Sequence, residues 1–378
     1  MKRNPFPITA YQGPDYFCNR LEETEKLSEA LLNGRNTTLF SPRRMGKTGL
    51  IRHLFNSMKG EKYNTIYVDI FGTKDLNGFI NRLANSALDA VTKKKDNFIT
   101  KAIEFFGKIR PQISYNELSG MPQVSFTLHG EAEKRATLKE ILEMLEGQKF
   151  SNFIAIDEFQ QINRYPEKNT EQILRSHFQH LNNCCFIFSG SQRHMLTSMF
   201  SDPRRAFYQS SEFLALEKLN KNEYKEFIHR QFLKNGQKID KGDIEFILEW
   251  TQIYTFYTQY LCNKIFSRGQ VNISADLIKD CMLEIFSERE AVFYNYRNLL
   301  AYHQFRLLEA IGREEIVHEP TSQGFIKKYD LSNPSTVRKS LQALVDKEMI
   351  YEITGGEKTS YQVYDVFLLR WLQSGMSR

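Results

Sequence analysis

The sequence predicts an α/β fold built on a parallel, doubly wound sheet, followed by a helical domain and a winged helix. Two segments predict the sheet: residues 37–58 read as an apolar strand, a loop and a helix, and Asn152–Ile156 is a continuous apolar run typical of a buried central strand. Strand and helix patterns alternate around them, as in sheets whose parallel strands are joined by helices. We therefore expect an α/β core over 1–216, a helical lid over 217–297 and a winged helix over 298–378.

The first of these segments, TTLFSPRRMGKTGL at 37–50, has the strand–loop–helix context of a phosphate-binding P-loop. Backbone N–H groups and the positive end of the helix would surround the phosphates, Lys47 would reach the β/γ oxygens, and Thr48 would complete the shell of a Mg²⁺ ion. Ser41 replaces the usual first glycine, so we expect strain or a changed conformation there. A chance Gly-Lys-Thr is the alternative. The predicted nucleotide-binding residues of the loop are Ser41, Pro42, Arg43, Arg44, Met45, Gly46, Lys47, Thr48 and Gly49.

The second segment ends in Asp157 and Glu158. Carboxylates at the C-terminal end of a parallel strand lie where ligands bind in open α/β sheets. We expect Asp157 to hold Mg²⁺ through water and Glu158 to polarise the attacking water, which is the Walker B arrangement of a hydrolysing ATPase. An acidic helix cap would explain this motif alone equally well, but not behind a P-loop about 110 residues upstream.

The other core elements are read from hydrophobic period and turn residues. Two alternating runs at about 111–128, separated by Gly120 and Pro122, predict an inserted hairpin. The remaining expected elements are strands at Tyr63–Ile70 and Cys184–Ser189 and helices at Tyr16–Leu32, Leu76–Val91, Phe98–Phe106, Ala132–Leu145 and Gln172–Leu181.

Two polar positions beyond the Cys184–Ser189 strand are candidates for phosphate contacts. Ser191 follows the strand and can hydrogen-bond the γ-phosphate or the water; an ordinary turn residue is the alternative. Arg204 and Arg205 lie in a later loop. An arginine brought to the γ-phosphate stabilises transition-state charge, and Arg205 is our candidate, against the alternative of a solvated surface pair.

The last 160 residues or so are predominantly helical by period. The aromatic residues between Trp250 and Tyr260 are expected to pack inside the helical lid rather than to form a stacking surface. Expected helices are Asn222–Leu233, Lys241–Glu249, Thr255–Phe266 and Ser274–Tyr294 in the lid and Tyr302–Ile311, Gln323–Tyr329 and Ser335–Lys347 in the winged helix, followed by strands Met349–Thr354 and Ser360–Val363.

In DNA-reading winged helices the third helix enters the major groove, where Arg338, Lys339 and the wing residue Lys358 would make contacts. From Glu319 to Arg378, however, eight basic and seven acidic residues give a net charge of +1. A DNA-binding domain usually has a basic face. Docking of a protein, or regulation within the chain, is therefore as consistent with this sequence as DNA binding.

Composition sets wider limits. The 378 residues are 41% hydrophobic and 25% charged, with a net charge of +6, which permits anionic partners without requiring nucleic acid. No run approaches 18 apolar residues and no signal-peptide core is present, so we expect no membrane span and a cytoplasmic location. Five scattered cysteines without a C-x-x-C pair predict free thiols rather than a zinc site.

Several strings together resemble the archaeal-type ATPases of the STAND clade, in the AAA+ branch of P-loop NTPases. They are FCNRLEE (17–23), LFSPRRMGKTGL (39–50), IAIDEFQQI (154–162), FIFSGSQRHML (186–196), RAFYQSSEFLALEKL (205–219) and FYTQYLC (256–262). The resemblance implies ATP rather than GTP, accepts Ser41 in the loop, and includes the predicted nucleotide contacts Phe17 and Arg20. Two departures concern nucleotide sensing: Ile253-Tyr254-Thr255 replaces a Gly-x-Pro motif, and Gln209 stands where relatives often carry arginine.

Two functions follow from these features. The first is a Mg²⁺-dependent ATPase switch, slow without its partner, whose lid closes on ATP and whose winged helix docks a protein or DNA. An ATP-dependent homo-oligomer is compatible with it. The alternative is a nucleotide-dependent DNA-binding regulator with little turnover. A metabolic kinase is a weaker third interpretation, because no acceptor-binding motif is evident.

Overall fold

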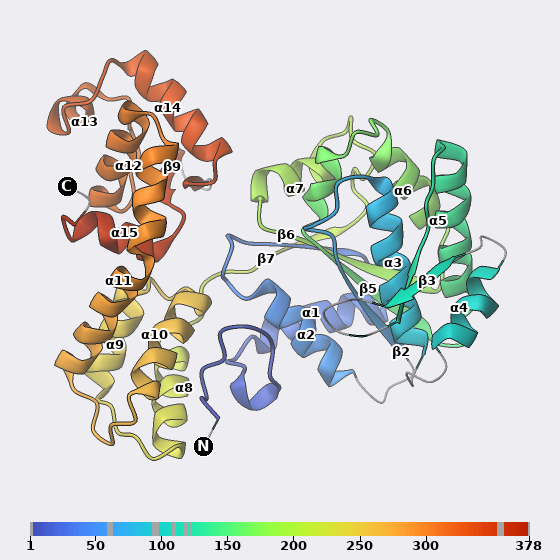
Figure 1. The fold of residues 1–378 in the computed structure, drawn as a ribbon, viewed down its shortest axis with the longest axis horizontal. Coiled ribbons are helices and arrows are strands. Elements are labelled where there is room, and N and C mark those ends of the chain that lie inside the picture. Colours follow the sequence, from blue (N-terminus) through green and yellow to red (C-terminus); the bar gives the residue numbers. More distant parts are fainter. Residues whose placement is uncertain are drawn as a thin grey trace. The chain divides into compact units, whose positions relative to one another are not determined.

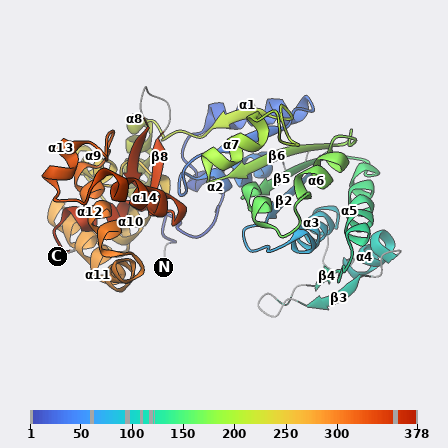
Figure 2. The same ribbon diagram turned by 90° about the horizontal axis from the view of Figure 1, so that it is seen from above.

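The computed structural model describes residues 3–58, 63–92, 98–107, 111–115, 120, 122–353 and 359–376. The chain divides into two compact units, Thr9–Lys218 and Met1–Ile8 with Leu219–Arg378, and each is described by itself (Figures 1 and 2). Within the described ranges, every helix is too short or too polar to span a bilayer.

The first unit contains the predicted parallel sheet. Its strands are β1 (Thr37–Phe40), β2 (Tyr63–Asp69), β5 (Ser151–Asp157), β6 (Cys184–Gly190) and β7 (Glu212–Ala215), in the order β2-β5-β6-β1-β7. Every neighbouring pair is parallel, which confirms the α/β prediction. Phe40 pairs with Gly190 and Asp69 with Asp157. The carboxyl ends of these strands therefore lie along one edge of the sheet, where ligands bind in such folds.

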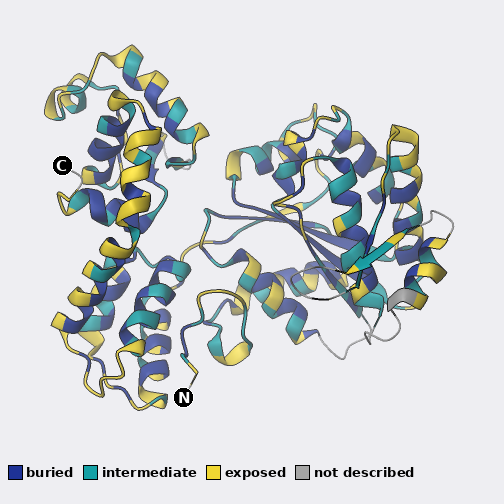
Figure 3. Ribbon diagram, viewed as in Figure 1, coloured by how far each residue is buried: buried dark blue, intermediate teal, exposed yellow. Residues whose placement is uncertain are grey.

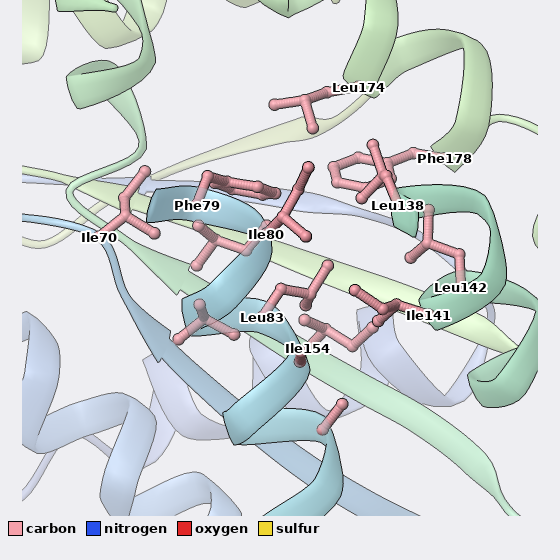
Figure 4. Close-up of a cluster of buried hydrophobic side chains, with 14 of the residues drawn as sticks. Ile70, Phe79, Ile80, Leu83, Leu138, Ile141, Leu142, Ile154, Leu174 and Phe178 are labelled. Carbon is pink, nitrogen blue, oxygen red and sulfur yellow. The ribbon is translucent and has the colours of Figure 1, made fainter. Parts of the chain in front are cut away.

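Helices cover both faces of this sheet. Helices α1 (Leu21–Leu32) and α2 (Lys47–Ser57) lie on one face, and α3 (Leu76–Val91), α5 (Glu131–Glu146) and α6 (Thr170–Phe178) lie on the other (Figures 1 and 2). Apolar side chains of α3, α5 and α6 meet β5 in a closely packed cluster (Figure 4). The central strands are buried throughout (Figure 3), which explains their continuous apolar pattern.

The hairpin of β3 (Gln112–Tyr115) and β4 (Pro122–Ser125) is attached to α3 by two asparagines. Asn85 donates to the Val124 carbonyl at 2.7 Å and accepts from the Val124 N–H at 2.9 Å. Asn81 makes the same pair of bonds with the backbone of Phe126. The two amides therefore replace a missing neighbouring strand along β4.

The remaining elements of this unit are η1 (Pro14–Tyr16), α4 (Phe98–Phe106), η4 (Phe159–Arg164) and α7 (Arg193–Ser201).

One predicted helix boundary is wrong. The helix expected from Tyr16 begins only at Leu21, because Asn19 and Arg20 have φ angles of 52° and 67°. These left-handed conformations cannot continue a right-handed helix. The segment before α1 is therefore a bent connection, and the side chain of Arg20 is buried.

The second unit is helical with one small hairpin. The N-terminal segment belongs to it: Phe6 is fully buried against Phe232 and Phe266, and the Asn263 amide donates to the Phe6 carbonyl at 2.7 Å. The elements are α8 (Lys221–Lys234), α9 (Lys241–Trp250), α10 (Thr255–Ser267), α11 (Ala275–Leu299), α12 (Tyr302–Glu314), α13 (Gln323–Lys328), α14 (Pro334–Asp346), β8 (Ile350–Ile353), β9 (Ser360–Val363) and α15 (Val366–Gln373).

The third helix of the winged helix, α14, has a side-chain cap at its N-terminus. The Asn333 side chain accepts from the Thr336 N–H at 3.0 Å, and Pro334 occupies the first turn of α14. The aromatic residues around Trp250 pack together as expected, but against the predicted winged helix: Phe367 of α15 lies between Trp250, Tyr257 and Tyr260, of which Tyr257 is buried and the other two are half-buried.

Candidate nucleotide-binding site

The loop between β1 and α2 has the backbone of an anion-binding turn. Its two positive φ angles belong to Arg44 (68°) and Gly46 (97°), and α2 begins at Lys47, directly after the second of them. Ser41 is not among the left-handed residues, so the strain expected from its missing glycine does not occur. Alternating right- and left-handed residues direct successive N–H groups toward one point, which is the geometry that binds phosphate at a helix N-terminus.

Lys47 is a buried cation held by the loop itself. Its side chain is only 6% exposed, and its ammonium group donates to the Ser41 carbonyl at 2.9 Å, the Ser41 hydroxyl at 3.2 Å and the Pro42 carbonyl at 3.3 Å. Burial lowers the pKa of Lys47 to about 8, while the nearby Glu158 and Asp157 carboxylates act in the opposite direction. A phosphate oxygen would offer this ammonium a full negative charge in place of neutral carbonyls.

The carboxylate of Asp157 is fixed from three sides. Its Oδ2 accepts hydrogen bonds from the Thr48 hydroxyl at 2.8 Å and from the Tyr67 phenol at 2.5 Å. Its Oδ1 accepts from the Glu158 N–H at 3.1 Å. Burial, followed by the adjacent Asp157 charge, raises the pKa of Tyr67, so the phenol remains a donor at neutral pH. Tyr67 was not among the predicted site residues.

Glu158 follows Asp157 in a left-handed conformation, with φ of 57°. Its Oε2 accepts from the Ser191 hydroxyl at 2.9 Å and from the Gln160 amide. Arg43 of the loop donates to the same hydroxyl at 3.4 Å. Gly190 leaves room for this arrangement, since a Cβ there would lie 2.0 Å from the Gln160 amide oxygen. Gln160 is the second site residue that the sequence interpretation missed, although it lies in the string IAIDEFQQI.

Of the two predicted contacts before α1, Phe17 lies against the P-loop helix and Arg20 against α1. Phe17 stacks on His53 of α2 with ring centroids 4.1 Å apart, and its ring would be 3.7 Å from a Cβ at Gly49. One terminal nitrogen of the Arg20 guanidinium donates a hydrogen bond to the Glu23 carboxylate at 2.6 Å. Its other terminal nitrogen is buried without a hydrogen-bond partner among the described residues. A buried donor in this state is the kind of group that a ligand acceptor would satisfy.

The oxygens at this edge suit Mg²⁺ only together with a phosphate. The described residues contain no group of three or more His, Cys, Asp or Glu able to hold a metal. Mg²⁺ in nucleotide sites typically takes one or two protein oxygens and completes its shell with phosphate and water. Thr48 and Asp157 provide two hard oxygens 2.8 Å apart, which fits that requirement.

Some predicted residues lie apart from this cluster. Arg205 donates to Asn163 at 2.5 Å and forms an ion pair with Glu171 of α6. Arg338 and Lys339 are exposed on α14 in the other unit. The predicted wing residue Lys358 is outside the described part of the chain.

Solved structures with a similar fold include a Walker-type ATPase and two ORC proteins. The chain is similar to the Walker-type ATPase PABY2304 of Pyrococcus abyssi, with a TM-score of 0.67 and 18% identity over 98% of this chain and 99% of that one. It is also similar to the Aeropyrum pernix ORC2 protein in ADPNP–ADP complexes (TM-score 0.55, 15% identity, 100% and 99% coverage). The A. pernix ORC1 protein in complex with DNA follows, at a TM-score of 0.53 and 13% identity over 96% and 94%. At these identities the likeness concerns the fold.

Sequence comparison assigns the family. No curated protein was found to match the chain. Residues 291–374 match the family of a "probable winged helix domain". Residues 17–253 match the family described as "ATPase domain predominantly from Archaea", and they include the whole P-loop, the Asp157–Glu158 strand end and Ser191. The chain therefore belongs to this family of predominantly archaeal ATPase domains and carries a C-terminal winged helix.

Proposed function

We propose that the chain binds ATP with Mg²⁺ at the P-loop and hydrolyses it as a molecular switch. The observation that carries the proposal is the contact of three separate segments at one sheet edge. Thr48 of α2 bonds Asp157 at the end of β5, and Glu158 bonds Ser191 at the end of β6. Lys47 lies within the electrostatic influence of both carboxylates.

Each residue has a distinct role in this proposal. Lys47 and the loop N–H groups bind the β- and γ-phosphates, and Thr48 and Asp157 hold Mg²⁺. The ion neutralises charge on the phosphate oxygens. Glu158 orients the attacking water and accepts its proton, for which its carboxylate must exchange the Gln160 amide for that water. Ser191 keeps its hydroxyl close to both the water and the γ-phosphate.

The proposed helical lid and the winged helix are joined by hydrogen bonds through which the movement of one would carry the other. The α9–α10 turn, which replaces the Gly-x-Pro motif of relatives, forms a chain of hydrogen bonds with the wing strands. Tyr254 and Tyr351 share a hydroxyl bond of 2.8 Å, the Tyr351 hydroxyl donates to Gln362 at 2.6 Å, and the Gln362 amide donates to Gln252 at 2.7 Å. We call these four residues the lid–wing joint.

Arg370 of α15 adds a second attachment. Its guanidinium donates to the carbonyls of Trp250 at 2.8 Å and Glu249 at 2.9 Å, at the C-terminal end of α9. A cation at this position satisfies helix carbonyls and complements the helix dipole. These contacts support coupling of nucleotide state to a winged helix that docks a partner.

The replacement of Glu158 by glutamine tests the hydrolytic assignment. Glu158→Gln should retain ATP binding and lose hydrolysis by about 100-fold or more, because an amide cannot accept the proton. Phosphate release with and without Mg²⁺, and nucleotide binding by calorimetry, measure the two properties. Glu143→Gln, at an exposed position paired with Lys139 on α5, is the control and should behave as wild type. Wild-type turnover in Glu158→Gln would refute the role of Glu158.

A second candidate function is a DNA-binding regulator in which turnover is small. The exposed positions of Arg338 and Lys339 on α14 favour it, as does the DNA complex reported for the similar ORC1 protein. Binding to duplex DNA should then weaken as salt rises and weaken further in the Arg338→Ala, Lys339→Ala double variant. Electrophoretic mobility at two salt concentrations measures this. Absence of any salt-sensitive binding would exclude this function.

Arg205 is proposed as the arginine that acts on the γ-phosphate, within one chain or across an ATP-dependent homo-oligomer. Its ion pair with Glu171 must open for this role. Arg205→Ala should lower kcat and leave ATP affinity unchanged. Light scattering with and without ATP reports the assembly.

A further inference from the structure

Tyr67 is the side-chain donor to Asp157 that does not come from the P-loop. It lies on β2, which runs parallel to β5, and it pairs in register with Ala155. Asp157 is two residues further along β5 on the same face of the sheet, a diagonal distance that a long aromatic side chain can reach. The phenol thus meets Oδ2 at 2.5 Å, on the same oxygen that Thr48 contacts at 2.8 Å.

The ring of Tyr67 is itself held in place. The guanidinium of Arg52, from the second turn of α2, lies 3.8 Å from the ring centroid. A cation at this distance over an aromatic face is attracted by the ring quadrupole. Tyr67 therefore connects β2, the Asp157 carboxylate and the P-loop helix.

The two side chains that donate to Oδ2, Thr48 and Tyr67, are expected to take different parts in Mg²⁺ binding. Thr48 is expected to contact Mg²⁺ directly, so its own orientation changes with the metal. Tyr67 has no such role, and its position depends on the sheet and on Arg52. Without it, Asp157 is oriented by the P-loop helix and its own backbone only, and the carboxylate gains rotational freedom.

We propose that Tyr67 is a positioning residue that holds Asp157 in the orientation required for Mg²⁺·ATP. The inference rests on the proposed function of the site. Residues that hydrogen-bond a metal-binding carboxylate orient it, and their removal typically costs about 10- to 100-fold in metal affinity.

The test is the Mg²⁺ dependence of nucleotide binding, measured with a fluorescent ATP analogue and not by turnover. In Tyr67→Phe, the Mg²⁺ concentration for half-maximal binding should rise about 10- to 100-fold. Binding of the same analogue in excess chelator should stay at the wild-type level, because the P-loop contacts remain. The control is Tyr63→Phe, which removes a hydroxyl from the same face of β2, where the ring stacks on Phe153 at 4.8 Å; it should leave both values unchanged.

The outcomes separate this inference from the function on which it rests. An unchanged Mg²⁺ requirement in Tyr67→Phe, with Mg²⁺-dependent binding intact in wild type, overturns the role of Tyr67 alone. If Tyr67→Phe also weakens binding of the analogue in excess chelator, the role of Tyr67 is overturned as well. Tyr67 would then support the whole site and not the orientation of Asp157 alone. If wild type binds no nucleotide at any Mg²⁺ concentration, both the proposed function and the role of Tyr67 fail.

Discussion

The nucleotide site of the first unit and the lid–wing joint of the second both join polar side chains, some of them buried, beside left-handed turns, yet they differ in charge. In the site, Lys47 and Asp157 are ionisable groups that are 6% and 4% exposed. In the joint, hydroxyls and amides bond each other beside Gln252 and Ile253, whose φ angles are 51° and 60°.

This difference separates a region that a charged ligand is expected to rearrange from one that it is expected to leave unchanged. Buried charges are costly unless paired, so a ligand with complementary charge gains by replacing their present partners. A neutral network of hydrogen-bonded hydroxyls and amides offers no comparable gain. We therefore expect nucleotide to change the site and to leave the joint intact.

The largest expected effect concerns the packing of Phe367 of α15 against the aromatic side chains of α10. Phe367 is fully buried and lies 4.7 Å from Tyr257 and 5.4 Å from Tyr260 by ring centroids. Phe367→Ala should lower the free energy of unfolding of the second unit by about 3–5 kcal/mol, as measured by urea titration, without changing ATP affinity. Tyr302→Ala, at an 80% exposed position, is the control. A matching loss of ATP affinity would show that this aromatic packing takes part in ATP binding.

The next effect is confined to the nucleotide site. Lys47→Ala should weaken ATP binding by about 100-fold or more, because a charge-assisted contact to phosphate is lost. Calorimetry measures the Kd. Lys26→Ala, which removes a largely exposed lysine of α1, should leave it unchanged. If Lys47→Ala retained wild-type ATP affinity, the phosphates would have to bind at a place other than Lys47.

A smaller effect follows from the lowered pKa of Lys47, about 8. Bound phosphate favours the charged ammonium and raises this pKa, so binding above pH 8 requires proton uptake. ATP affinity should therefore be flat below pH 8 and fall by up to about tenfold per pH unit above it. Titrations from pH 7 to 9.5 at constant free Mg²⁺ measure the slope. In Lys47→Arg the residual binding should lack this slope; an equal slope in both proteins would assign the titration to another group.

The smallest effect concerns a single hydroxyl of the joint. Tyr254→Phe removes its bond to Tyr351, whose hydroxyl still donates to Gln362. We expect a loss of about 1 kcal/mol in unfolding free energy, seen in the same urea titration. Tyr351→Phe should cost more because it removes both hydrogen bonds of the Tyr351 hydroxyl, the one to Tyr254 and the one to Gln362. An altered ATP affinity in Tyr254→Phe would instead indicate that this turn retains nucleotide sensing.

The elements that the sequence could predict are those set by local pattern. The P-loop and the Asp157–Glu158 strand end are contiguous motifs next to buried apolar strands, and both lie as expected. Strand β7 and helix α15 are among the elements that were missed. Strand β7 has only four residues, and α15 has six apolar residues among eight, so neither shows a periodicity that distinguishes helix from strand.

The site residues that escaped prediction act across the sheet. Tyr67 reaches Asp157 from a strand about 90 residues away in sequence. Gln160 is close in sequence to Glu158, but its fit depends on Gly190 of the neighbouring strand. No local pattern indicates either contact, because each exists only once strand order and register are known.

By itself the sequence determined the chemical inventory of this protein: a phosphate-binding loop, a pair of carboxylates, and an ATPase core followed by helices with a winged-helix pattern. Only the tertiary structure decided that the expected strain at Ser41 is absent, that Tyr67 orients Asp157, and that the turn at Gln252–Tyr254 holds the wing strands. The reason is physical. Motifs are set by neighbouring residues along the chain, whereas hydrogen bonds between elements depend on distances that folding alone creates.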